Sequence, residues 1–164
     1  LVENLKETEY YAPLKKIKDT DNVTLYDYNL ALDLYYYTST WKEQKKILKK
    51  SDLELFMRDR GSKIDLLNIQ WIYRAKKYYN MKPADIYLML IPIHYKLSTE
   101  LVKDMVEAPG VEEFENVVIR TTYARHYNFK QNLTMEQMYA DCLHHLYTAD
   151  RRKNPYSVLS LIHI

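Results

Sequence analysis

Glycine is nearly absent from this sequence, since only Gly61 and Gly110 occur among its 164 residues. Hairpins, sheet bulges and phosphate-binding loops use glycine because it adopts positive φ angles at no steric cost. The glycine patterns of dinucleotide-binding folds and phosphate loops are both missing. The scarcity of glycine therefore nearly excludes these two nucleotide-binding classes.

Cysteine, long apolar runs and an excess of one charge are also missing. The single cysteine, Cys142, excludes an internal disulfide framework and suits a reducing cytosol. The longest apolar run, Ile86 to Ile93, is far shorter than the roughly 20 residues of a membrane span. The net charge is +2, with both signs mixed along the chain, whereas a nucleic-acid binder more often shows a concentrated basic face.

The two ends do not resemble natural termini. The first residue is Leu1 instead of methionine, and the chain stops at Leu-Ile-His-Ile. We expect the sequence to be a fragment of a longer protein. Its length still allows a sizeable core, because a chain of this size buries roughly 70% of its unfolded surface.

The best-defined element is a helix over Gly61–Tyr79. Wound at about 100° per residue, its apolar side chains form two arcs, a broad one around Trp71 and Ile72 and a narrower one around Ile69. A helix that is apolar on two sides usually lies inside a bundle. Asn68 falls inside the broad arc, so the spacing predicts polar contacts that fix how this helix is seated on its neighbours.

Helical spacing continues through the rest of the chain, and no useful stretch alternates with period two. The sequence therefore predicts an all-α protein. We expect a helix interrupted near Pro13, another from Leu25 that packs on two sides, and a kink or short break at Gly61. Further helices are expected over these ranges: 83–91, 99–106, 111–127, from 135 onward and from 156 onward.

Several helix starts have recognisable capping residues. Thr24 with Asp27 and Thr134 with Gln137 have the spacing of capping boxes, and Ser98 is a good N-cap. Residues 42–50 are rich in lysine and are expected to be solvated.

A weak internal repeat relates two of these helices. Residues at a constant shift of 110 match as follows: Leu25, Tyr28, Leu32, Tyr37 and Thr38 with Met135, Met138, Cys142, Tyr147 and Thr148. Spacing of this kind is common to amphipathic helices. The repeat predicts three parts: the end of a preceding helical unit in 1–23, a helical domain in 24–133, and the truncated start of a further unit in 134–164.

Chemistry-bearing residues form few clusters. Asp65, Asn68 and Arg74 are the most suggestive polar set, and a role in seating the helix is favoured over catalysis because all three follow one helix. Asp141, His144 and His145 can share a helix face, but a zinc site needs ligands from elsewhere. Cys142 between them suits a small core residue. We predict no catalytic, cofactor-binding or metal-binding residue.

Four ordered segments give the chain a family resemblance. They are LALDLYYYTSTW at 30–41, IDLLNIQWIYRAKKY at 64–78, LIPIHYKLS at 90–98 and NPYSVLSLI at 154–162. In their order and spacing, the chain resembles the C subunit of the bacterial and archaeal V/A-type rotary ATPases, which is the counterpart of the eukaryotic d subunit. The strongest part is Ile64, Asp65, Asn68, Ile69 and Arg74.

The resemblance implies a fold and a role. The fold is a funnel of three similar helical domains. The role is that of a non-catalytic coupler without cofactor, which lies at the cytoplasmic face of the membrane and links the central stalk to the membrane rotor ring of a proton- or sodium-translocating ATPase. The family has no short catalytic signature to transfer.

Two other functions remain open from the residues alone. One is a helical nucleic-acid- or peptide-binding module that uses tyrosines, 17 in number, and basic residues such as Arg151, Arg152 and Lys153. The other is a helical enzyme built on Asp141, His144 and His145.

Overall fold

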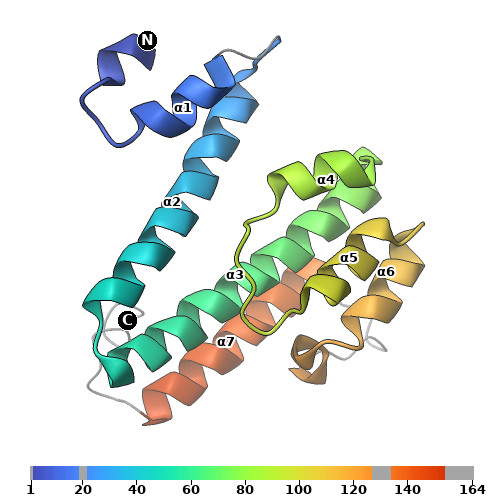
Figure 1. Cartoon of the computed structure of the whole chain (residues 1–164). Helices are drawn as coiled ribbons and strands as arrows, with labels where there is room; N and C mark the ends of the chain where they lie inside the picture. The colour runs from blue at the N-terminus through green and yellow to red at the C-terminus, as the bar shows by residue number, and fades with distance from the viewer. Residues whose placement is uncertain (1, 19–21, 127–133, 154–164) are drawn as a thin grey trace. The chain divides into compact units, whose positions relative to one another are not determined.

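Helices account for all the regular structure that the described residues contain. The computed structural model describes residues 2–18, 22–126 and 134–153. The elements are η1 (Val2–Leu5), α1 (Tyr11–Lys18), α2 (Leu25–Ile47), α3 (Lys50–Tyr79), α4 (Pro83–Met89), α5 (Thr99–Glu107), α6 (Val111–Val118), η2 (Thr122–His126) and α7 (Met135–Lys153) (Figure 1). The predicted all-α class is confirmed. The helix expected from residue 156 lies outside the described residues.

Local capping chemistry decides where several helices begin. Thr24 and Asp27 form the predicted capping box at the start of α2. Thr134 and Gln137 form the second, with the Thr134 backbone nitrogen 2.7 Å from Gln137 Oε1. Ser98 Oγ accepts from the Leu101 nitrogen at 3.1 Å at the start of α5. These three predictions are confirmed.

The chain divides into two compact units. The first holds Leu1–Leu53 with Met89–Pro92, and the second holds Glu54–Leu88 with Ile93–Ile164. The predicted three-part division is not tested by these units and stays a prediction.

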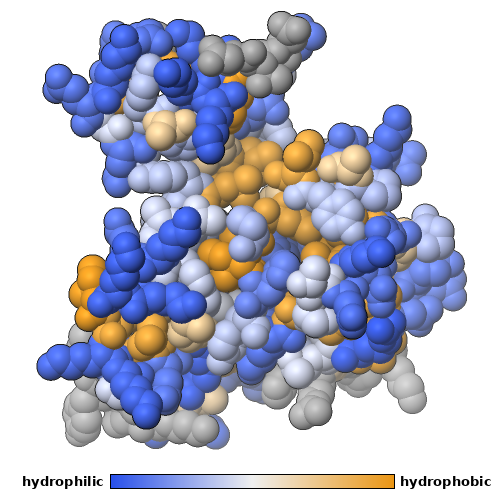
Figure 2. Space-filling view, in the orientation of Figure 1, coloured by the Kyte–Doolittle hydropathy of each residue, from blue (hydrophilic) through white to orange (hydrophobic). Residues whose placement is uncertain are grey.

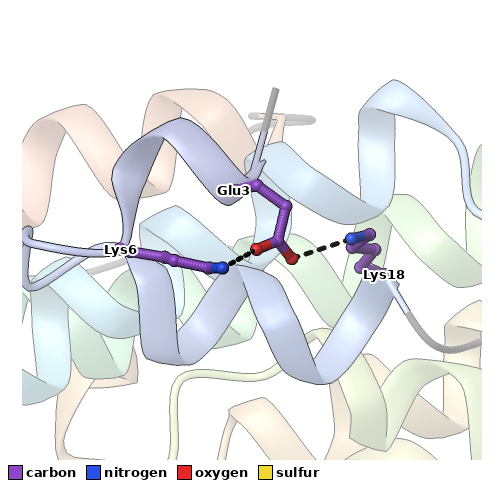
Figure 3. Close-up of polar contacts among 3 residues, drawn as sticks. All are labelled: Glu3, Lys6 and Lys18. Carbon is purple, nitrogen blue, oxygen red and sulfur yellow. Dashed lines mark hydrogen bonds and ion pairs between the residues drawn. The ribbon is translucent and has the colours of Figure 1, made fainter.

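In the first unit, α1 and α2 lie side by side (Figure 1). The Tyr10 and Tyr35 rings meet edge to face with centroids 6.0 Å apart, and the Tyr35 hydroxyl donates to Glu9. A surface ion-pair cluster ties η1 to α1, because the Glu3 carboxylate contacts both Lys6 and Lys18 (Figure 3). Hydrogen bonds from these lysines, Lys6 first, lower the pKa of Glu3 to about 2.

One prediction for the first unit is wrong, and a second needs qualification. Pro13 does not break a helix: it is the third residue of α1, where its missing N–H would have no partner in any case. Helix α2, which was expected to pack on two sides, has no fully buried residue. The side chains of its two apolar stripes are partly covered: Tyr28, Leu32 and Tyr35 on one, and Leu30, Leu34, Tyr37 and Trp41 on the other. At the head of α2, Leu25 is 76% exposed. Periodicity shows which faces of a helix can be covered, but the covering depends on its neighbours.

The second unit holds a continuous apolar core. Helix α5 lies beside α6 (Figure 1), and the Tyr73 ring of α3 meets the Phe114 ring of α6 with centroids 6.0 Å apart. The buried apolar residues of α3 are Phe56, Ile64, Leu66, Ile69, Ile72, Tyr73 and Ala75, and those elsewhere in the unit include Ile86, Val102, Met105, Val106, Phe114, Val118, Met135 and Met138. Burying each large side chain contributes about 1.5–3 kcal/mol.

Helix α3 differs from its prediction in three respects. It runs without a break through Gly61. It begins at Lys50, so Ser51 and Asp52, whose types would suit an N-cap, lie inside its first turn instead. Trp71 is only partly buried, while Tyr78 is 57% exposed although it falls on the predicted apolar arc. The helix ends as predicted at Asn80, whose φ of 46° is left-handed.

The helix predicted over 111–127 is shorter than expected. Helix α6 ends at Val118, and the 3-10 helix η2 follows from Thr122. The Thr121 side chain donates to the Val118 carbonyl at 2.7 Å, and its backbone nitrogen donates to the same oxygen at 2.9 Å. These i to i−3 contacts tighten the chain and end the α-helical pattern.

Candidate functional site

The side chain of Asp65 is fully buried in the second unit and accepts four hydrogen bonds. Helix α3 presents this carboxylate to the segment before α5. The backbone nitrogens of Tyr95, Lys96 and Leu97 donate to it at 3.0, 2.7 and 3.2 Å. One carboxylate thus satisfies three successive N–H groups of a segment that forms no regular structure.

A fourth donor comes from η2. The Tyr123 hydroxyl donates to Asp65 Oδ2 at 2.7 Å. Burial, followed by the charge of Asp65, raises the pKa of Tyr123, so the phenol stays protonated and remains a donor. We call Asp65 with its four donors, from Tyr95, Lys96, Leu97 and Tyr123, the Asp65 cluster.

Close packing accompanies these hydrogen bonds. A Cβ atom on Gly61 would lie 2.5 Å from Tyr95 Cγ and 2.7 Å from Tyr95 Cβ. The missing side chain of Gly61 therefore lets Tyr95 approach the α3 backbone one turn before Asp65. This close approach, and no kink, explains a glycine in the middle of a long helix.

The other members of the predicted polar set behave differently. Asn68 is fully buried, as the arc predicted, but Arg74 is exposed and takes no part in the Asp65 cluster. The contacts of Asp65 agree with a role in seating α3, and its preference over catalysis stays a prediction.

A second long-range contact of α3 involves Lys76, which no pattern in the sequence indicated. Its ammonium donates to the carbonyls of Val106 and Ala108 at 2.7 and 2.6 Å, at the C-terminal end of α5. A cation there complements the helix dipole. Burial lowers the pKa of Lys76. The sequence around Lys76 contains no pattern that would have predicted this cap of α5.

The residues of the enzyme hypothesis are not arranged as a site. Asp141, His144 and His145 are all exposed on α7, and no group of three or more His, Cys, Asp or Glu side chains in the described ranges is placed to hold a metal. Cys142 is buried and donates to the Tyr123 carbonyl at 3.7 Å. Burial raises the pKa of this thiol to about 11, which suits a core residue.

The hydrogen bonds of Asp65 and Lys76 therefore hold α3 against other segments of the second unit. Every contact of the Asp65 cluster and of Lys76 joins α3 to a segment about 30 or more residues away. None of the helices within the described ranges has the length and apolar character that crossing a membrane requires.

Comparison with known proteins decides the family. The model of the ATP synthase (C/AC39) subunit family matches residues 1–164, which is the whole chain. The chain belongs to the ATP synthase (C/AC39) subunit family. This agrees with the resemblance carried by the four sequence segments.

A curated relative carries a matching description. The C subunit of the A-type ATP synthase of Methanosarcina mazei is 32% identical over 123 residues, which cover 75% of this chain and 32% of that protein. The chain thus aligns with about a third of the length of this C/AC39 relative. No solved structure gives a significant match.

Proposed function

We propose that this chain acts in a non-catalytic coupling subunit of a V/A-type rotary ATPase that moves protons or sodium ions. In this role the protein joins the central stalk to the membrane rotor ring at the cytoplasmic face of the membrane. It is a peripheral part of the complex and needs no cofactor. The family match over the whole chain supports the assignment to the complex.

The observation that carries the coupling role is the Asp65 cluster. A coupling part has to resist deformation while its partners push on it. The buried carboxylate holds α3 against the segment before α5 and against η2 through four hydrogen bonds. Hydrogen bonds to a charged group are stronger than neutral ones, about 1.5–3 kcal/mol each.

Lys76 adds a second fastening point on the same helix. Asp65 and Lys76 are eleven residues apart, which is about 16 Å along α3 at 1.5 Å per residue. Two polar contacts at separate levels oppose bending and sliding better than apolar packing alone, because hydrogen bonds are directional. The capping boxes at Thr24 and Thr134 also support the proposed helical repeat, which the three-domain funnel of the family would contain.

The binding part of this proposal is tested with purified components. The purified protein is mixed separately with the rotor ring in detergent and with the central-stalk proteins, and binding is measured by size-exclusion chromatography. We expect stable complexes with both, and no ATP hydrolysis by the protein alone. ATP hydrolysis by the purified protein, or failure to bind either component, would overturn the proposal.

A further inference from the structure

A concentrated basic surface lies at the end of α2 and in the turn to α3, entirely within the first unit. We call it the basic turn. It contains a single carboxylate, that of Glu43, and five lysines, all exposed: Lys42, Lys45, Lys46, Lys49 and Lys50. Lys42, Lys45 and Lys46 follow i, i+3, i+4 spacing and so share one face of the last turns of α2.

These positive charges have no carboxylate partners among the described residues. None of the five ammoniums makes one of the ion pairs found there, whereas Lys6 and Lys18 both contact Glu3 (Figure 3). The Lys45 ammonium lies 5.6 Å from the centroid of the Trp41 ring. Five neighbouring cations repel one another, and a folded chain keeps such a cluster most readily where an anionic surface offsets it.

An apolar side chain follows the α2 lysines in the sequence and lies on another side of the helix from Lys42 and Lys45. Ile47, the last residue of α2, is 72% exposed. In the space-filling view, hydrophobic atoms lie beside hydrophilic ones where α2 turns into α3 (Figure 2). The basic turn thus offers charge and an apolar group on one short segment.

We propose that the basic turn binds the surface of an anionic phospholipid bilayer. The lysine ammoniums contact the headgroup phosphates, and Ile47 enters the boundary between headgroups and acyl chains. A segment with several lysines and an exposed apolar residue has the chemistry of interfacial membrane binding. This inference does not depend on the coupling role.

The composition of the basic turn favours lipid over an acidic protein or a nucleic acid. All five cations are lysines, and none is arginine. Arginine binds carboxylates and phosphates in fixed bidentate geometry and is enriched at protein interfaces, where lysine is depleted. A flexible ammonium suits the diffuse charge of a headgroup layer, and neither a nucleic acid nor an acidic peptide supplies the apolar layer for Ile47.

Vesicle co-sedimentation tests the proposal on the purified chain. One set of vesicles is phosphatidylcholine alone, and the other is an equal mixture of phosphatidylcholine and phosphatidylglycerol. We expect binding to the anionic vesicles only, and weaker binding at high salt because the Debye length shortens. In the K42Q/K45Q/K46Q variant, affinity falls roughly 100-fold, at about fivefold per lysine. In Ile47→Ser, affinity falls severalfold at low and high salt alike.

The matched control is K15Q/K16Q/K82Q, which removes the same charge from three exposed lysines elsewhere. Lys15 lies 5.7 Å from the Tyr11 ring centroid, as Lys45 lies near Trp41, so each triple variant also loses one cation–π contact. We expect the control to bind nearly as well as the original chain. Equal losses in the two triple variants would overturn the proposal. So would equal binding to both vesicle types, or binding to polyglutamate or duplex DNA without binding to anionic vesicles.

Discussion

At the residue scale, the second unit depends on a small number of side chains with distant partners. Asp65 is the clearest case, because its carboxylate accepts from three backbone nitrogens and one phenol while fully buried. A buried charge is stabilising only when its hydrogen bonds are complete. The positions of residues 95–97 and of Tyr123 therefore depend on the charge of the Asp65 carboxylate and on both of its oxygens.

We predict that Asp65→Asn lowers the free energy of unfolding by about 3 kcal/mol. The amide would turn an N–H group toward the donors of the Asp65 cluster and would lose the charge. Tyr123→Phe removes one donor to the carboxylate and costs about 2 kcal/mol. Urea unfolding followed by circular dichroism measures both values.

The control for this comparison is Asp33→Asn on α2, where the carboxylate is exposed. A surface change of this kind stays within about 0.5 kcal/mol. If Asp65→Asn is no more destabilising than Asp33→Asn, the Asp65 cluster does not hold α3 in place.

Gly61 gives a second prediction. Gly61→Ala improves helix propensity by about 1 kcal/mol, but its methyl group meets Tyr95, whose backbone nitrogen is fixed by Asp65. Overpacking costs about 1–3 kcal/mol, so we expect net destabilisation of about 1 kcal/mol by thermal unfolding.

Gly110→Ala is the comparison for this change. A Cβ there meets only a carboxylate oxygen of Glu113, the far end of a side chain that can move away. Its cost is expected to be about 0.5 kcal/mol, because alanine is a poorer N-cap than glycine. A more stable Gly61→Ala protein would show that Tyr95 does not need this close approach.

At the element scale, the helices differ in what secures their ends. Threonine capping boxes start α2 and α7, whereas the end of α5 depends on Lys76 from a different helix. A cap supplied from far along the sequence links the stability of α5 to the position of α3.

Lys76→Met tests this link. The carbonyls of Val106 and Ala108 lose a charged donor, and we expect a cost of about 2 kcal/mol with faster hydrogen exchange of the α5 amides. Lys103→Met is the control, since its exposed ammonium lies 4.0 Å from Glu107 and contributes little. Unchanged exchange in α5 after Lys76→Met would contradict the proposed cap.

The sequence predicted the features that local chemistry decides. Thr24, Ser98 and Thr134 begin helices because their caps involve residues three positions away. The hydrogen-bond partners of Asp65 lie 30 to 58 residues away and could not be read from spacing. The break expected at Gly61 was wrong for the same reason, because the need for glycine comes from Tyr95.

At the scale of the whole molecule, the chain is helical and belongs to the ATP synthase (C/AC39) subunit family. The coupling role is a proposal that the protein resists deformation under load. It rests on α3 being held at two levels, by Asp65 and by Lys76, inside one compact unit. The proposed role is to transmit force, with ATP chemistry taking place elsewhere in the complex.

The most direct test compares a rotary ATPase reconstituted in vesicles with and without the protein, and measures ion transport and ATP hydrolysis in the same sample. We predict that hydrolysis continues in its absence while ATP-driven transport is lost, and that adding the protein restores transport. Transport that proceeds at the same ratio to hydrolysis without the protein would contradict the account.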